Sequence, residues 1–300
     1  MTPRLVGPEV AARLDWIAVS EAIAAGHLMP RAGIGDTFLY RGADTMLSRA
    51  AWIDGLGLAV KTATIFPANP GRGLAAVNGA LCLYDDRDGR LAALVDFHLV
   101  TRWKTAADSL LAARRLARPE ARAITLVGAG NVAAAMAEAY AAAFPGARFT
   151  IWNRSPGGAA RLAAAIGGQA SDDLEAAVRG ADIVCTATMA TAPLVRGAWL
   201  RPGQHLDLIG AYRPDMREVD DDALARARLF VDSRETTLAH IGELKDPLSR
   251  GVIAPGDVIA DFYEPGLFAR RSDDEITLAK NGGGAHLDLM VARHILDVAG

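Results

Sequence analysis

The chain has 300 residues, of which 51% are hydrophobic and 22% are charged, and its formal net charge is -3 at pH 7. This length suits two domains, and the small negative charge, without a run of lysines or arginines, excludes a nucleic-acid-binding surface. The N-terminal segment has no unbroken apolar core, and no window offers about 18 uncharged apolar residues, so we expect neither a signal peptide nor a transmembrane helix. Cys82 and Cys185 lie in separate apolar runs. They are expected to be buried free thiols in a reducing compartment, which predicts a cytoplasmic protein.

The first part of the chain predicts a helix followed by a sheet. Apolar residues recur at helical spacing on two faces of residues 9–26, so this helix is expected to be covered on both sides. Between residues 36 and 96, short apolar runs are separated by Gly, Asn, Asp and Pro, which is typical of mixed or antiparallel strands. Asp85–Gly89 has the composition of a hairpin turn. Helical periodicity returns over residues 101–117, with Thr101 as the expected N-cap.

Strands and helices alternate after Pro119. The expected strands cover residues 123–127, 148–152, 182–186, 205–209 and 228–232, and the expected helices cover residues 131–143, 157–166 and 172–179. This order predicts a parallel, doubly wound sheet. A last helix, within "GAHLDLMVARHILDVAG", is expected to pack back on the earlier domain. The predicted fold class is therefore α/β, with a Rossmann-type domain of residues 118–286 and a mixed α+β domain of residues 1–117 and 287–300.

A glycine-rich turn connects the first of these strands to its helix. The sequence Gly128-Ala129-Gly130-Asn131-Val132-Ala133 follows "AITLV" and opens a helix, which is the context that the dinucleotide-binding fingerprint requires. Gly128 permits the tight turn, and Gly130 lets the backbone approach a pyrophosphate, while Ala133 replaces the third glycine. The helix N-terminus offers free N–H groups to the phosphates. We therefore assign Gly128 to Val132 to cofactor binding.

The end of the second strand indicates which nucleotide is bound. An NAD site normally has Asp or Glu there, whereas this strand ends in Asn153-Arg154-Ser155. A guanidinium and a hydroxyl favour a 2′-phosphate, so NADP(H) is favoured over NAD(H). The alternative is that Arg154 is a solvated charge and that either nucleotide is used. Further positions expected at the ligand crevice are Thr186, Thr188 and Gly210.

Six motifs in the same order make the chain resemble the ornithine cyclodeaminase/μ-crystallin family over essentially its whole length. They are "AVKTATIFPANP" at 59–70, "TRWKTAADSLLAARRLA" at 101–117, "LVGAGNVA" at 126–133, "IWNRS" at 151–155, "LIGAYRPDMREVD" at 208–220 and "TLAKNGGGAHLDL" at 277–289. The fourth and fifth are most similar to the ketimine-reductase side of the family, where NADPH use is common. The resemblance implies a homodimer. It also implies a first domain for dimerisation and substrate, a second for the nucleotide, and an active site between the two.

The resemblance further implies hydride transfer to or from the Cα of a small amino or imino acid, whose carboxylate requires cations. Arg41, Lys61 and Lys104 stand at or near the carboxylate-binding positions of the family. Lys61 lies on an apolar strand, where a buried cation needs a partner. Many relatives have arginine at the position of Lys104, and lysine cannot form the bidentate fork. Lys280 and Asn281, beside a glycine run, are expected to contact the cofactor.

Tyr212 stands where ornithine cyclodeaminases and the related alanine dehydrogenase carry an aspartate that acts on the substrate amine. A tyrosine keeps its proton at neutral pH and cannot replace that carboxylate. Reduction of a preformed C=N bond does not need it. We therefore predict an NAD(P)H-dependent reductase of Δ1-pyrroline-2-carboxylate or Δ1-piperideine-2-carboxylate, giving L-proline or L-pipecolate. Tyr212, Lys61 and solvent stay open as proton donors.

Other functions remain open at this point. An acyclic substrate would make the protein an alanine dehydrogenase-like or iminosuccinate-type enzyme, and extra cations would favour a dicarboxylate. Ornithine cyclodeaminase activity is disfavoured by Tyr212. A non-catalytic NADPH-binding protein, similar to μ-crystallin, is the alternative from a different class, and Lys61 argues against it. The histidines show no metal-ligand spacing with Asp, Glu or Cys, so no metal is predicted. Neither a nucleic acid nor a membrane is expected as a partner.

Overall fold

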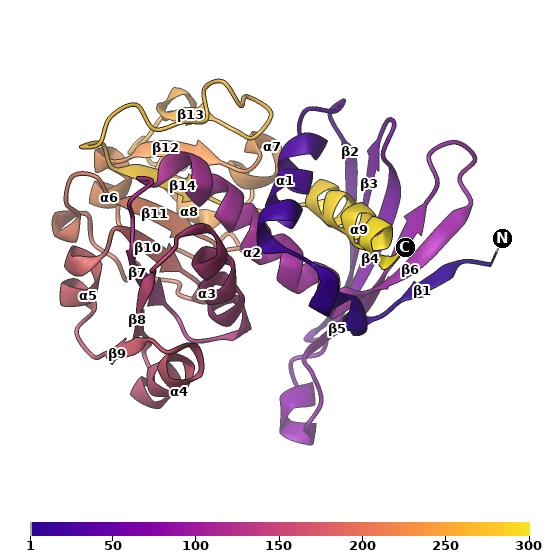
Figure 1. Cartoon of the computed structure of the whole chain (residues 1–300), viewed down its shortest axis with the longest axis horizontal. Coiled ribbons are helices and arrows are strands. Elements are labelled where there is room, and N and C mark those ends of the chain that lie inside the picture. Colours follow the sequence, from indigo (N-terminus) through magenta and orange to yellow (C-terminus); the bar gives the residue numbers. More distant parts are fainter. Residues whose placement is uncertain (1) are drawn as a thin grey trace. The chain divides into compact units, whose positions relative to one another are not determined.

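The computed structural model describes residues 2–300, and the chain divides into two compact units. Unit 1 consists of Met1–Lys104 and Gly284–Gly300, and unit 2 of Thr105–Gly283. Unit 1 is a mixed sheet with helices, and unit 2 is a parallel sheet between helices (Figure 1). The predicted α/β fold class is confirmed.

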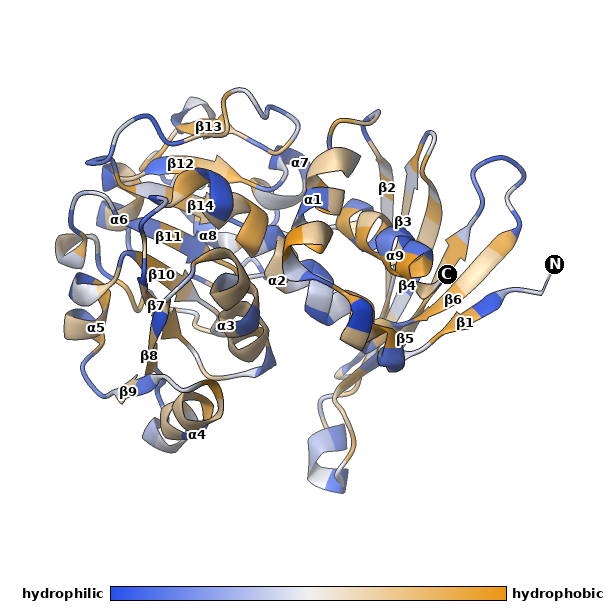
Figure 2. Cartoon of the chain, viewed as in Figure 1, coloured by the Kyte–Doolittle hydropathy of each residue, from blue (hydrophilic) through white to orange (hydrophobic). Residues whose placement is uncertain are grey.

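Unit 1 is built on one six-stranded sheet. Its strands lie in the order β1-β6-β5-β4-β3-β2, and all neighbours are antiparallel except β1 and β6, which are parallel. The strands are β1 (Arg4–Val6), β2 (Gly33–Arg41), β3 (Asp44–Ile53), β4 (Gly57–Ile65), β5 (Val77–Tyr84) and β6 (Leu91–Asp96). The predicted hairpin turn connects β5 to β6, and Figure 2 shows it in the colour of hydrophilic residues. The prediction of a mixed sheet is therefore confirmed.

The face of this sheet that carries the core is covered by α1 (Trp16–Gly26) and by α9 (Ala285–Ala299), which packs on α1, β3 and β4. The expectation that the last helix returns to the first domain is thus confirmed. The single helix expected over residues 9–26 is wrong, because a 3-10 turn (Pro8–Arg13) precedes α1. Asp15 between them is extended, and its side chain accepts a hydrogen bond from the Ala18 amide, so it begins a new helix.

The helix α2 (Phe97–Leu116) runs from unit 1 into unit 2. Its N-terminus lies four residues before the predicted Thr101, because Asp96 accepts a hydrogen bond from the Leu99 amide at 2.7 Å, whereas the Thr101 hydroxyl donates back to the Phe97 carbonyl. The units divide between residues 104 and 105 and between 283 and 284, rather than at the predicted 117/118 and 286/287. The reason is that the second half of α2 packs within unit 2, where Asn281 bonds to Ser109.

Unit 2 has an eight-stranded parallel sheet in the order β13-β12-β14-β11-β10-β7-β8-β9. Its strands are β7 (Ala123–Val127), β8 (Arg148–Trp152), β9 (Gln169–Ser171), β10 (Ile183–Thr186), β11 (His205–Leu208), β12 (Arg228–Val231), β13 (Val258–Ala260) and β14 (Thr277–Lys280). The helices are α3 (Asn131–Ala143), α4 (Pro156–Ile166), α5 (Leu174–Gly180), α6 (Asp221–Arg226), α7 (Arg234–Thr237) and α8 (Gly242–Ser249). All predicted strands occur, whereas β9, β13 and β14 were not predicted.

The strand order of unit 2 reverses at β7, whose neighbours are β8 and β10. The helices α3 and α4 follow β7 and β8 on one face of the sheet, and α5 packs on the other face (Figure 1). In doubly wound sheets, ligands bind beyond the carboxyl ends of the strands at such a reversal. The residues after β7, β8 and β10 are therefore the first place to look for a ligand.

Two smaller expectations can be compared with the structure. Cys82 and Cys185 are free, as predicted, although Cys82 is only half-buried. Within residues 2–300, the structure has no helix whose length and apolar character would let it cross a bilayer.

Candidate functional site

The glycine turn of unit 2 has the geometry of an anion cradle. Gly128 follows β7 with a φ of +118°, and a Cβ there would lie 2.5 Å from the Ala187 carbonyl oxygen, so only glycine fits. Nothing lies within 4 Å of the position of a Cβ at Gly130, so the space above this residue is open. The helix α3 begins at Asn131, and no side chain caps its first amides. These amides and the helix dipole are therefore available to a phosphate.

A cavity of about 330 Å³ lies along this turn. It is lined by predicted cofactor residues, namely Gly128, Ala129, Gly130, Asn153, Arg154 and Thr188. The loop after β10 supplies much of the opposite wall, including Met189, which is exposed to 67%. The predicted Asn131 and Val132 are exposed at the start of α3. The structure thus brings the strand ends around β7 together in one cavity, as a dinucleotide site requires.

The end of β8 carries no carboxylate. Arg154 is exposed beside the cavity, and the Asn153 side-chain amide donates to the Ser155 carbonyl at 3.0 Å. Ser155 stands at the N-cap of α4, where its side chain makes no capping hydrogen bond. An exposed guanidinium and a free hydroxyl are the groups that would meet a 2′-phosphate.

Thr186 and Gly210 lie behind the cavity wall, where both bind Glu218. The Thr186 hydroxyl donates to one Glu218 carboxylate oxygen at 2.8 Å, and the Gly210 and Ala211 amides donate to the same oxygen. The Thr188 amide and hydroxyl donate to the other oxygen at 2.8 and 2.7 Å. Glu218 is fully buried. Thr186 is likewise fully buried and does not line the cavity, so the predicted cofactor contact of its side chain has to be corrected to a hydrogen bond with Glu218.

Lys280 and Asn281 lie in the interior of unit 2 and present no surface to a cofactor. The Lys280 side chain is 0% exposed, and its ammonium donates to the carbonyls of Leu208 and Asn281 at 2.8 and 2.6 Å. Asn281 donates to Ser109 and Asp207. Burial lowers the pKa of Lys280 against the opposing effect of the surrounding carboxylates, of which Glu218 is the first. The predicted cofactor contacts of these two side chains therefore have to be corrected to internal packing.

Unit 1 contains a buried ion pair between Lys61 of β4 and Asp288 of α9. The Lys61 ammonium lies 2.9 Å from the Asp288 carboxylate, and the two side chains are only 8% and 1% exposed. Burial lowers the pKa of Lys61, and the charge of Asp288 partly opposes this. Burial would raise the pKa of Asp288, but the charges of Lys61, Lys104 and Arg49 outweigh it and lower that pKa. The need for a partner that the apolar strand implied for Lys61 is thus met by a residue of the last helix.

Two further cations surround this pair. Arg49 lies directly opposite Lys61 in the neighbouring strand β3, and its guanidinium binds Asp36 at 2.7 Å. Lys104, on α2, lies close enough for its charge to act on Lys61 and Asp288. Within residues 2–300 no hydrogen bond or ion pair involves the Lys104 ammonium. Of the three cations, Lys104 is therefore the one whose charge is available to an anionic ligand.

Arg41 and Tyr212 do not belong to this group. Arg41 lies at the tip of the β2–β3 hairpin, where it pairs with Asp44 at 2.9 Å and is 80% exposed. Asp44 precedes Arg49 by five residues in β3, which is about 17 Å along the strand and on the opposite face of the sheet. Tyr212, in unit 2, is 57% exposed in the loop after β11. The structure thus joins Lys61 and Lys104 but not Arg41.

Burial also acts on a histidine of this region. His286 follows the glycine run on α9 and lies edge-on to His27, with ring centroids 5.4 Å apart. Burial lowers the pKa of His286 to about 3. The imidazole is therefore neutral at physiological pH and adds no positive charge beside Lys61, Arg49 and Lys104.

Three important residues were not found from the sequence. Arg49 could have been found, because it and Lys61 flank the "DGLG" turn at positions that face one another in a hairpin. Asp288 stands in a helical apolar stretch and is separated from Lys61 by 227 residues, so no local pattern connects them. Glu218 lies in the quoted "RPDMREVD" motif, and its position after a predicted strand end was the available signal.

A family model described as "Ornithine cyclodeaminase/mu-crystallin family" matches residues 50–300. The chain belongs to this family. It is 52% identical, over 299 residues, to the Δ1-pyrroline-2-carboxylate reductase of Paracoccus denitrificans (strain Pd 1222), and the match covers 97% of this chain and 95% of that protein.

Two solved structures have a similar fold. The Thermococcus litoralis Δ1-pyrroline-2-carboxylate reductase, in complex with NADH and L-proline, superposes with a TM-score of 0.90 at 25% identity, covering 99% of this chain and 97% of that one. An archaeal alanine dehydrogenase dimer with bound NAD gives a TM-score of 0.91 at 26% identity, covering 100% and 96%. Family membership thus agrees with a nicotinamide-binding enzyme and does not by itself decide the substrate.

Proposed function

We propose that the protein is an NAD(P)H-dependent reductase that transfers hydride to the C=N carbon of small cyclic imino acids. Its substrates are Δ1-pyrroline-2-carboxylate and Δ1-piperideine-2-carboxylate, and its products are L-proline and L-pipecolate. The observation that carries the proposal is the cation group of unit 1, in which Lys61 and Arg49 are paired with carboxylates and Lys104 makes no ion pair with any residue from 2 to 300. A single available positive charge suits a monocarboxylate. The 52% identity to a protein named for this activity supports the same substrate class.

The cofactor fits the cavity of unit 2. The open space above Gly130, the uncapped amides of α3 and the close approach of Gly128 to the neighbouring loop form the cradle that a pyrophosphate needs. When bound, the nicotinamide supplies the hydride. Arg154 and Ser155 support a preference for NADP(H), because they would contact a 2′-phosphate. Relatives of known structure hold NADH or NAD, so both nucleotides belong in the test.

The residues of unit 1 hold and orient the substrate in this proposal. Lys104 binds the carboxylate as a point charge, since a lysine cannot form the bidentate fork of arginine. The hydrogen bond to Asp288 holds the Lys61 ammonium in place and leaves N–H groups of that ammonium for another acceptor. The imine nitrogen must gain a proton, and the lowered pKa of Lys61 makes its Nζ a better donor than an ordinary lysine. Solvent and Tyr212 remain the alternative donors.

Three neighbouring activities compete with this proposal. Deamination of ornithine needs a carboxylate for the amine, and Tyr212 stands in the place of that group. An alanine dehydrogenase-like reaction is supported by the TM-score of 0.91 to the archaeal enzyme. A dicarboxylate such as iminosuccinate would need a second available cation besides Lys104.

The test is an absorbance assay with NADPH and NADH against the two cyclic imino acids, pyruvate with ammonia, and iminosuccinate, with ornithine and NAD in parallel. We expect the cyclic imino acids to give the highest kcat/KM. If wild-type protein binds NADPH tightly but oxidises it with none of these substrates, the non-catalytic binding protein is the better interpretation. Turnover of pyruvate with ammonia in preference to the cyclic imines would favour the dehydrogenase.

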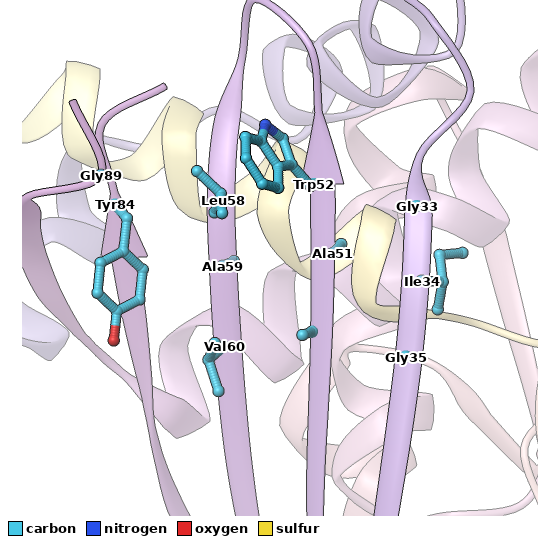
Figure 3. A pocket seen from close by; sticks show the side chains of 11 residues that line it. Gly33, Ile34, Gly35, Ala51, Trp52, Leu58, Ala59, Val60, Tyr84 and Gly89 are labelled. Carbon is cyan, nitrogen blue, oxygen red and sulfur yellow. The ribbon is translucent and has the colours of Figure 1, made fainter. Parts of the chain in front are cut away.

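We further propose that the protein is a homodimer that associates through the outer face of the unit 1 sheet. A groove of about 550 Å³ lies on this face, and Figure 3 shows Trp52, Leu58, Val60 and Tyr84 along it, with α9 behind the sheet. Trp52 is 52% exposed although its ring is apolar. A relative of known structure is described as a dimer. Light scattering should give twice the chain mass for wild type and the chain mass for W52D; a monomeric wild type would refute the proposal.

We also propose a cytoplasmic location. Two free thiols are kept reduced in that compartment, and the proposed cofactor is found there. Fractionation of the producing cells, with recovery in the soluble fraction, is the check.

A further inference from the structure

We propose that Glu218 is a positioning residue that sets the affinity of the cofactor cavity by holding the loop after β10 in place. This inference rests on the proposed cofactor site. It concerns a residue that lies behind the cavity and that is too deeply buried to contact a ligand.

The carboxylate of Glu218 ties two strand ends together. One oxygen accepts from the Thr186 hydroxyl at the end of β10 and from the Gly210 and Ala211 amides after β11. The other oxygen accepts from the amide and hydroxyl of Thr188. The Gly210 amide also donates to the Thr186 carbonyl at 3.1 Å, whereas the other four donors bond to Glu218 alone, so the Glu218 carboxyl group is what satisfies the polar groups where both loops begin.

The backbone around Glu218 holds the same loop. Its carbonyl accepts from the amides of Leu194 and Val195 at 2.9 and 3.0 Å, and the Arg217 amide donates to the Ala190 carbonyl at 3.0 Å. Thr188, Ala190 and Leu194 all line the cavity. The segment around Glu218 therefore anchors one wall of the cavity at both its beginning and its end.

The packing around Gly210 leaves this arrangement no room to shift. A Cβ at Gly210 would collide with the Glu218 carboxylate and with the backbone of Thr188. The amides of Glu218 and Val219 in turn donate to the buried carboxylate of Glu243, at 2.7 and 3.1 Å. Two buried carboxylates in succession thus connect the cavity wall to α8. A change at Glu218 should move the wall, because a wall residue is its direct partner.

The substitution E218Q tests this inference. A glutamine keeps the size of the side chain but turns an NH₂ group toward donors on one side, whichever way the amide is oriented. We expect the dissociation constant for NADPH and for NADH, measured by ligand fluorescence without substrate, to rise at least tenfold. The kcat at saturating cofactor should fall much less than the affinity.

Asp182 provides a matched control in the same sheet. It also accepts two backbone amides, those of Arg122 and Ala123, at 3.0 Å, but it lies at the opposite ends of β7 and β10. D182N should lower the melting temperature as E218Q does and leave cofactor affinity within twofold of wild type. If E218Q does not fold, T186V removes a single donor to Glu218, and T125V removes the buried Thr125 hydroxyl of β7 as its control. T186V should raise the dissociation constant about threefold and T125V should not.

The outcomes separate this inference from the proposed function. If wild-type protein binds neither nucleotide, the proposed function fails and this inference fails with it. If wild type binds and E218Q (or T186V, where E218Q does not fold) binds within twofold of it, only the positioning role of Glu218 is refuted. Equal weakening in E218Q and D182N would also refute it, because that result would report general loosening of unit 2.

Discussion

Replacing Asp288 by asparagine would remove the charge that faces Lys61 and leave its shape almost unchanged. At 2.9 Å and an effective dielectric constant of about 20, two unit charges attract each other by about 6 kcal/mol. Desolvation offsets part of this attraction, and removal of one partner of a buried pair typically costs about 3–5 kcal/mol. We therefore expect D288N to lose about 3–5 kcal/mol of the free energy of unfolding at pH 7. The loss should shrink as the pH falls, because the lowered pKa of Asp288 stabilises the fold only while the carboxyl is ionised.

The same substitution changes the titration of Lys61. Without Asp288, burial lowers the pKa of Lys61 further, so the ammonium is lost at a lower pH than in wild type. Urea unfolding at pH 7 and the pH dependence of kcat/KM between pH 6 and 9 measure both effects. D85N is a suitable control, since the Asp85–Arg87 pair is exposed and should leave both curves unchanged. If D288N unfolds at the wild-type urea concentration and keeps the wild-type pH profile, the Lys61–Asp288 pair does not have the role assigned to it.

The other predictions concern separate groups. K104A should raise the KM for the imino acid at least tenfold, whereas R41A should stay within twofold, because Arg41 is exposed and outside the cation group; equal effects in steady-state kinetics would contradict this assignment. R154A should raise the KM for NADPH about tenfold and leave that for NADH almost unchanged, and an unaltered ratio would show that Arg154 is only a surface charge. Burial raises the pKa of Glu243 from 4.5 to about 7. A raised carboxyl pKa contributes stability that is present below pH 4.5 and lost as the pH rises through 7. The free energy of unfolding of E243Q, relative to that of wild type, should therefore rise by about 3 kcal/mol between pH 4.5 and pH 8. Urea unfolding measures this difference, and a difference that does not change with pH would refute the prediction.

Much of unit 2 could be predicted because its signals are local. A strand, a glycine turn and a helix follow one another between Ala123 and Ala143, and the structure has the expected bounds for both elements. The prediction of a single helix over residues 9–26 was wrong, because apolar spacing alone does not detect that the Asp15 side chain begins a new helix. The strands β9 and β13 have only three residues, which is too short for a periodic pattern. The four residues of β14 were missed although β10, β11 and β12, which are equally short, were predicted.

In the candidate site, too, the residues with local sequence signals were predicted and those that depend on distant contacts were not. The residues of the cofactor cavity follow strand ends, and a fold class with known crevice positions identifies them in advance. The cation group of unit 1 depends on the register of β3 against β4, which places Arg49 and not Arg41 opposite Lys61. The short "DGLG" turn indicates that register, whereas no sequence pattern pairs Lys61 with Asp288 across the whole of unit 2. The burial of Lys280 was missed for a similar reason, because its hydrogen-bond partners are backbone carbonyls.

The path of the chain through α9 has a consequence for biosynthesis. Residues 105–283, which make up unit 2, leave the ribosome before α9 does, although α9 supplies part of the core of unit 1 and the counter-ion of Lys61. During translation, all strands of unit 1 are therefore made before α9, and Lys61 lacks its counter-ion until Asp288 has been made. Unit 2 can already fold at that stage. A chain interrupted before residue 284 would contain all of unit 2, but its unit 1 would lack α9.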